Sequence, residues 1–314
     1  MKKFLLQLSL FLTIILAIIS LLNIFHSRHN NEPPHYKLQY TETTNSQSKY
    51  NSIIIGTSMA THGIRPSQLD TSERRYYNLA LNGTTPDFYL KWLNNLFNVS
   101  HPKVDYWIVS TDLFFLSGAG WRDFEQDSEF FPSKNFWEML MNNTSLDKSL
   151  LVSNRLPLIK YRSRVLNSFE NHQGAYEFIV DEYDRGYITL KRNDKVDFSK
   201  DVNYTIKITE DAKSKYTELI DSLLTLGGEI IIIIPPVFSF LPEQYIQAKI
   251  FLEVLSKEKN IPLYDFNDEI FDDKLQSTEN FVDFIHLSGK GSKIFSSLLK
   301  QRINARTHNN VYTK

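Results

Sequence analysis

The sequence predicts a three-layer α/β domain on a mostly parallel five-stranded sheet, preceded by one transmembrane helix. Five short apolar runs, each bounded by turn residues, are typical of parallel strands that are buried on both faces. Amphipathic helical patterns lie between most of these runs, and strand–helix alternation favours a parallel sheet with helices on both faces. A long apolar run at the N-terminus predicts the additional helix.

The N-terminal run covers residues 4–25 and contains no charged residue. About 20 apolar residues suffice for a helix to cross a membrane, whereas the apolar part of a cleaved signal peptide is only about 7–15 residues long. No small-residue cleavage site follows the run, so residues 1–25 are expected to form a cytoplasmic tip and an uncleaved anchor. Residues 26–49 are polar and are expected to be a linker. We therefore expect a single-pass cell-membrane protein whose main domain lies outside the cytoplasm.

The folded domain is expected to occupy residues 50–305, followed by a tail at 306–314. Pro86 fits the first turn of one helix, Gly227 fits the end of another, and Ser288 can cap the last one. The expected strands are 52–55, 77–81, 106–109, 229–234 and 262–264, and the expected helices are 86–97, 210–226, 241–259 and 288–303.

Residues 114–205 interrupt this alternation. The segment is rich in aromatic residues and has no clear period, except for helix-like pieces at 136–141 and 156–169. Ligands of open α/β sheets bind at the carboxyl ends of the strands. We therefore expect a large irregular insertion that covers one end of the sheet and shapes a substrate site.

Composition excludes several classes of function. The net charge is −1 and no block of Lys and Arg is present, so nucleic-acid binding has no electrostatic support. The chain has no cysteine, which excludes disulfides, cysteine-bound zinc and a thiol nucleophile. No spacing typical of a metal site or a phosphate loop occurs, so neither a metal nor a cofactor is expected.

Two short motifs follow the first and the last expected strands. Gly56-Thr57-Ser58 ends the first strand, and Asp283 and His286 form a D-x-x-H motif after the last. A serine nucleophile needs a base within hydrogen-bond reach, and the base needs an orienting acceptor. Each motif alone is common, but together they predict Ser58 as nucleophile, His286 as general base and Asp283 as the residue that orients it. An α/β-hydrolase nucleophile elbow is disfavoured, because its last glycine is replaced by Ala60.

A third candidate stretch contains Asn82 and Gly83, at the end of the second expected strand. A glycine turn there can point a backbone N–H into the crevice, where acyl transfer needs donors for the developing oxyanion. By itself the stretch is an ordinary turn before a helix. His62, four residues after Ser58, is expected at the surface.

The three motifs together resemble those of the SGNH (GDSL-like) hydrolase superfamily, in the same order. Gly56-Thr57-Ser58 is similar to the first block, Gly83 to the glycine of the second, and Asp283 with His286 to the last. The resemblance implies a flavodoxin-like sandwich with a Ser-His-Asp triad. It also implies that the backbone amides of Ser58 and Gly83 bind the oxyanion.

The anchor and the sequence around the end motifs resemble the membrane-anchored DltD- and AlgJ-like branch of that superfamily. This resemblance implies a serine acyltransferase or esterase acting on O-acyl, most simply O-acetyl, groups of envelope polysaccharide, with a multi-span O-acyltransferase as partner. Two positions differ: Thr57 replaces the usual Asp of the first block, and Asp112 stands where the third block has an asparagine donor. The alternatives are a periplasmic carbohydrate esterase that removes acyl groups and a non-catalytic polysaccharide-binding partner of the acyltransferase.

Overall fold

The chain divides into two compact units in a computed structural model. One unit contains residues 1–33 and 125–173, and the other contains residues 34–124 and 174–314. The structure describes residues 2–29, 49–97, 103–120, 122, 124, 133–142, 146–153, 176–192, 196–198, 206–238, 242–268 and 275–311.

The larger unit contains a five-stranded sheet in the order β2-β1-β3-β6-β7, and every neighbouring pair is parallel. This confirms the predicted α/β class, and the order corresponds to the flavodoxin-like arrangement 2-1-3-4-5. The last strand begins one residue later than expected because Pro262 has no N–H to donate, although its carbonyl accepts from Ile232 N at 2.9 Å. The strands are β1 Ser52–Ile55, β2 Tyr76–Asn78, β3 Tyr106–Ser110, β6 Glu229–Ile234 and β7 Leu263–Asp265.

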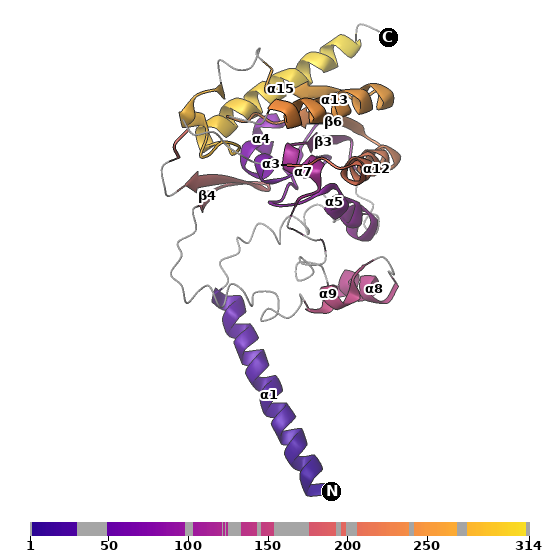
Figure 1. The fold of residues 1–314 in the computed structure, drawn as a ribbon, viewed down its shortest axis with the longest axis vertical. Helices are drawn as coiled ribbons and strands as arrows, with labels where there is room; N and C mark the ends of the chain where they lie inside the picture. The colour runs from indigo at the N-terminus through magenta and orange to yellow at the C-terminus, as the bar shows by residue number, and fades with distance from the viewer. Residues whose placement is uncertain are drawn as a thin grey trace. The chain divides into compact units, whose positions relative to one another are not determined.

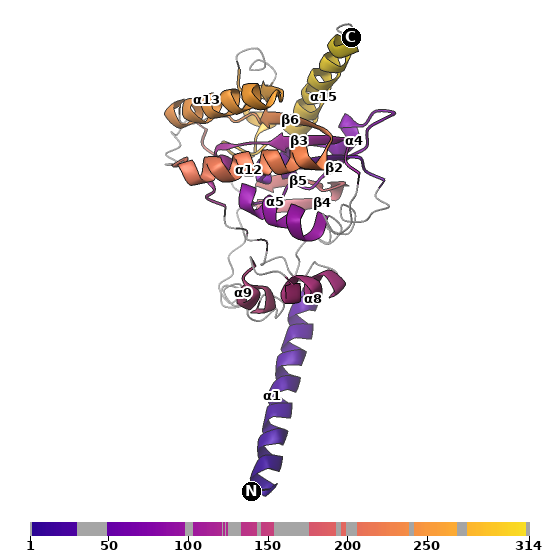
Figure 2. The same cartoon turned by 90° about the vertical axis from the view of Figure 1, so that its right-hand side faces the viewer.

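Helices cover both faces of this sheet (Figures 1 and 2). One face carries α3, α4 and α15, which pack on one another over a buried cluster that includes Ile54, Ile108 and Ile231. The other face carries α5, α12 and α13, which lie side by side in Figure 2. The helices are α3 Ser58–Gly63, α4 Pro66–Leu69, α5 Pro86–Trp92, α12 Glu210–Leu226, α13 Pro242–Lys259 and α15 Gly289–Val311.

Most of the expected helices have the expected bounds. The Thr209 hydroxyl accepts from Ala212 N at 3.2 Å and caps α12, which ends at Gly227 with a φ of 85°. After Trp92, α5 continues as one π-helical turn, Leu93–Phe97. The last helix extends past the expected end at residue 303 into the segment predicted to be a tail.

The expected insertion is more regular than predicted. Tyr176–Asp184 (β4) and Tyr187–Arg192 (β5) form an antiparallel hairpin in the larger unit, which also contains α7, Leu113–Ser117. The smaller unit contains α8, Ser133–Asn142, and α9, Lys148–Ser153. The helix-like piece predicted at 156–169 lies outside the described residues.

The N-terminal apolar run lies within α1, Lys2–His29, which belongs to the smaller unit. Among the residues that the structure describes, no helix is both long and apolar enough to span a membrane.

Candidate active site

Ser58 is the first residue of α3, immediately after the first strand. The turn depends on Gly56, whose φ is 151° and where a Cβ atom would lie 2.6 Å from the Ser110 carbonyl oxygen of the adjacent strand. No other residue fits so close to a backbone carbonyl. Thr57 then caps α3, accepting from Met59 N at 3.4 Å. The sequence thus places Ser58, which is partly exposed, at the carboxyl end of β1, an inner strand of the sheet.

Asp283 and His286 lie in a turn that the Asp283 carboxylate itself holds. Its Oδ1 atom accepts from the backbone amides of Ile285 at 2.8 Å and His286 at 2.7 Å. Two amide donors on one oxygen fix the side chain relative to the backbone, so the other oxygen has a defined direction. That oxygen, Oδ2, lies 2.7 Å from His286 Nδ1.

The two ends of the domain meet at a hydrogen bond between His286 and Ser58. His286 Nε2 lies 2.7 Å from Ser58 Oγ. Burial raises the pKa of the Asp283 carboxyl, but the hydrogen bond and charge of His286 outweigh burial and hold the pKa below its usual value. Asp283 is therefore ionised at neutral pH and accepts from Nδ1–H, which leaves the Nε2 lone pair facing the Ser58 hydroxyl. This is the geometry in which a histidine can take a proton from serine.

Asp112 is buried, with 6% of its surface exposed, and both of its carboxyl oxygens have protein partners. Oδ1 accepts from Phe115 N at 2.9 Å and caps α7, while Oδ2 accepts from the Thr57 hydroxyl. Burial raises the pKa of this carboxyl and the Thr57 hydrogen bond opposes the increase. Asp112, which was expected beside an oxyanion, therefore links the end of β3 to the end of β1 through its bond with Thr57.

Asn82 and Gly83 form a turn after the second strand, and Gly83 has a positive φ of 74°. Arg122 holds this turn through two carbonyl oxygens, donating to Asn82 O from Nε at 3.0 Å and to Gly83 O from its amide at 2.9 Å. The Asn82 side-chain oxygen is buried and has no hydrogen-bond partner among the described residues. In the part of the chain that the structure describes, no hydrogen bond joins either residue to Ser58 or His286.

Two side chains near His286 were missed or misplaced by sequence reasoning. Tyr176, in the insertion, donates from its hydroxyl to Asp283 Oδ2 at 2.7 Å. His62 is buried rather than exposed, with Nδ1 2.8 Å from the Ile188 carbonyl oxygen and its ring 6.0 Å from the His286 ring. The spacing of His62 and Ser58 is a signal only once α3 is known to be a helix, and Tyr176 has no local signal.

The part of the chain that the structure describes contains no cluster of three or more His, Asp or Glu side chains that could hold a metal ion.

Comparisons with known proteins give no family. No protein-family model matches the chain, and no curated protein matches it. Seventeen chains among solved structures match it. One is a 2.00 Å crystal structure from Bacteroides fragilis NCTC 9343 of a protein described as a candidate acylhydrolase. It has a TM-score of 0.44 and 12% identity, and the match covers 88% of this chain and 97% of that chain. Similarity this distant assigns no function to this chain.

Proposed function

We propose that this protein is a serine-dependent acyl-transfer enzyme, an esterase or acyltransferase, with Ser58, His286 and Asp283 as its triad. The observation that carries the proposal is the continuous chain of hydrogen bonds from Ser58 Oγ through the His286 ring to Asp283, with 2.7 Å at both steps. Ser58 and His286 are 228 residues apart in sequence and belong to different elements, so a local turn does not explain their contact.

In the first half-reaction, Ser58 Oγ attacks the acyl carbonyl carbon of an ester. His286 Nε2 takes the hydroxyl proton, and Asp283 stabilises the imidazolium that results. The tetrahedral intermediate collapses as the bond between the carbonyl carbon and the leaving oxygen breaks. His286 then returns the proton to that oxygen, which leaves as an alcohol, and the acyl group stays on Ser58.

In the second half-reaction, an acceptor hydroxyl attacks the acyl-serine ester. His286 takes the acceptor's proton and later gives it to Ser58 Oγ, which restores the free enzyme. Water as acceptor gives a carboxylic acid, so the reaction is hydrolysis. A sugar hydroxyl gives a new O-acyl sugar, so the reaction is transfer.

The oxyanion is proposed to bind the backbone amides of Ser58 and Gly83, as the SGNH resemblance implies. Asp112 supplies no amide donor there, because a carboxylate replaces the asparagine of the third block. A missing donor typically costs about 3–4 kcal/mol of transition-state stabilisation. We therefore expect slow turnover, which fits transfer to a specialised acceptor.

For the biological setting, we propose a single-pass anchored protein that acts outside the cytoplasm on O-acyl groups, most simply O-acetyl, of envelope polysaccharide. The uncharged run at 4–25 supports the anchor. The resemblance to the DltD- and AlgJ-like branch supports the polysaccharide and a multi-span O-acyltransferase as partner. A carbohydrate esterase would use the same triad with water as the acceptor.

The test compares Ser58→Ala with Ser222→Ala, a control on α12 whose hydroxyl donates to the Glu218 carbonyl at 2.8 Å. The full chain, in mild detergent, is incubated with 4-nitrophenyl acetate, and released nitrophenol and acyl-protein mass are measured. We expect Ser58→Ala to lose the acetyl-protein adduct and to slow the reaction at least about 10³-fold. Ser222→Ala should form the adduct and react at the wild-type rate. An unchanged rate in Ser58→Ala would refute the triad.

A second arm separates the three settings. Adding an envelope glycan to the acetyl-enzyme is expected to give O-acetyl glycan in addition to acetate, whereas acetate alone indicates the esterase. In cells, unchanged polymer acylation with Ser58→Ala would support the non-catalytic partner.

A further inference from the structure

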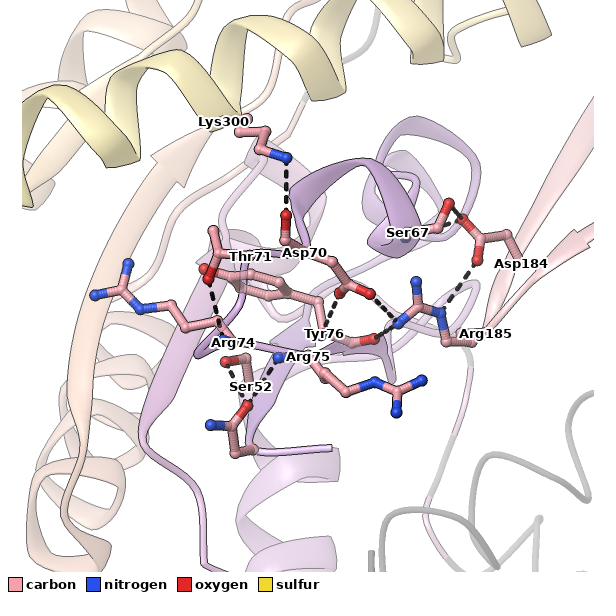
Figure 3. Close-up of polar contacts among 11 residues, drawn as sticks. Ser52, Ser67, Asp70, Thr71, Arg74, Arg75, Tyr76, Asp184, Arg185 and Lys300 are labelled. Carbon is pink, nitrogen blue, oxygen red and sulfur yellow. Dashed lines mark hydrogen bonds and ion pairs between the residues drawn. The ribbon is translucent and has the colours of Figure 1, made fainter. Parts of the chain in front are cut away.

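The β4–β5 hairpin is fixed to the main sheet at its turn (Figure 3). Arg185 Nη1 lies 2.9 Å from Asp70 Oδ2, and the Arg185 carbonyl accepts from Asn78 N at 2.9 Å. Asp184 Oδ2 accepts from the Ser67 hydroxyl at 2.6 Å. These bonds join the turn to α4 and to the end of β2, so the hairpin has a defined position relative to the sheet.

The start of β5, next to the turn, contacts both helices that follow the proposed catalytic residues. The Ile188 carbonyl lies 2.8 Å from His62 Nδ1 in α3, the helix that Ser58 begins. The Tyr187 hydroxyl lies 2.9 Å from Ser292 Oγ in α15, the helix that follows His286. Tyr187 and Ile188 are both buried. The hairpin therefore connects α3, which begins with Ser58, to α15, which follows His286.

The far end of the hairpin reaches the site itself. The Tyr176 hydroxyl donates to Asp283 Oδ2 at 2.7 Å, and the same oxygen is 2.7 Å from His286 Nδ1. The Tyr176 and His286 rings meet edge to face with centroids 6.1 Å apart. The guanidinium of Arg192, in β5, lies 5.4 Å from the centre of the Tyr176 ring.

From these contacts we infer that Tyr176 is a positioning residue, which holds Asp283 Oδ2 toward His286 and sets how much of its negative charge the imidazole feels. The inference rests on the proposed function, because it gives Tyr176 a role only if Asp283 orients a general base. Tyr176 contacts no reacting atom, so its effect passes through Asp283.

The two donors on Oδ2 determine the expected effect. A hydroxyl that donates to a carboxylate oxygen withdraws charge from it, and removing that donor leaves more charge for His286 Nδ1–H. The imidazolium is then favoured up to a higher pH, so the acid limb of the rate profile moves upward. The carboxylate also loses one of its four donors and is held less firmly. Among the described residues, the charged and titratable groups that face His286 are Asp283 on its own turn, Asp112 before α7, His62 in α3 and Tyr176 in β4, and Arg192 in β5 faces the Tyr176 ring.

The experiment compares Tyr176→Phe with Tyr183→Phe, both in β4, in the full chain in mild detergent. The Tyr183 hydroxyl is bonded instead to the Tyr77 hydroxyl, at 3.2 Å, so Tyr183→Phe is a matched control on the same strand. With 4-nitrophenyl acetate, we expect Tyr176→Phe to lower kcat about three- to tenfold with KM unchanged, the loss that one hydrogen bond of about 1 kcal/mol gives. Its acid limb should move to higher pH, while both parameters of Tyr183→Phe stay at wild-type values.

Proton NMR provides a readout that needs no turnover. The His286 Nδ1–H resonance should lie at low field and shift in Tyr176→Phe, including in a Ser58→Ala background, but not in Tyr183→Phe. The inference is wrong if Tyr176→Phe matches wild type in kcat, pH profile and resonance while Ser58→Ala is inactive. It is equally wrong if both tyrosine variants change alike, since the hairpin would then act only as a scaffold. An active Ser58→Ala would instead refute the proposed function.

Discussion

Replacing Asp283 by Asn and by Ala separates its two tasks, because each oxygen has different donors. Oδ1 accepts from the amides of Ile285 and His286, which hold the turn, and Oδ2 accepts from His286 Nδ1 and the Tyr176 hydroxyl. Asparagine can place its carbonyl oxygen at Oδ1 and keep the turn. Its NH₂ group then faces Nδ1, so the ring must carry its proton on Nε2, toward Ser58. A histidine in that tautomer cannot accept the serine proton.

The expected magnitudes follow from this difference. Loss of the base tautomer typically costs a triad about 10⁴-fold in kcat, or roughly 5.5 kcal/mol of barrier. Asp283→Ala loses the same function. It also leaves the backbone amides of Ile285 and His286 without their acceptor, at a position where the Asp283 side chain is only 7% exposed. Unpaired buried donors cost about 1–3 kcal/mol each. We therefore expect Asp283→Ala to be about 2–6 kcal/mol less stable than Asp283→Asn, with a Tm lower by roughly 4–24 °C.

The assays are 4-nitrophenyl acetate hydrolysis and thermal unfolding followed by circular dichroism. A pH series adds a check on the sign. The native pKa of Asp283 lies below the usual value of 3.8, so its stabilising effect is complete above that pH and is lost as pH falls through the native pKa. The stability advantage of wild type over Asp283→Asn should shrink below about pH 4. The reasoning fails if Asp283→Asn keeps more than a tenth of the activity, or if the Ala variant unfolds no earlier than the Asn variant.

Two further predictions concern the scaffold of the site. The free energy of unfolding of Asp112→Asn should stay within about 1 kcal/mol of wild type, because asparagine caps helices as well as aspartate and its amide can donate to the Thr57 hydroxyl oxygen. Asp112→Ala should lose about 2–3 kcal/mol of that free energy in urea unfolding. Equal losses in the two variants would contradict this account. Gly186→Ala should destabilise the fold by at least about 2 kcal/mol, because its Cβ would lie 1.7 Å from the Asn78 carbonyl oxygen. Gly227→Ala is the control in thermal unfolding. Its φ of +85° resembles the +93° of Gly186, but apart from its chain neighbours no described residue has an atom within 4 Å of its Cβ position.

The central layer of the fold was predictable from sequence because its strands are buried on both faces. The isoleucine runs of β1 and β6 gave both strands their correct bounds, and Gly227 gave the end of α12. The end of β2 was not predictable from local pattern. The Asn78 side chain donates to the carbonyls of Ala60 and Ile64, a tertiary contact that helps end the strand.

The hairpin was missed because it has no alternating pattern. All four residues at 187–190 are buried, and four of the six residues at 181–186 are charged, a local pattern that favours a loop. The site divides in the same way. Local spacing brought Asp283 and His286 into one turn, whereas the contact of Tyr176 with Asp283 crosses 107 residues and has no local sign. The catalytic roles of Ser58, His286 and Asp283 stay a prediction.

The separation of Ser58 from His286 by 228 residues has a consequence for biosynthesis. Ribosomes make the N-terminal part first, so a nascent chain that has reached Ile261 already carries Ser58 but neither Asp283 nor His286. Without its base, a serine hydroxyl is an ordinary alcohol. On the proposed mechanism, Ser58 therefore lacks its base throughout most of translation and becomes competent only when α15 docks beside α3. That mechanism predicts that a growing chain does not react with esters before it has folded.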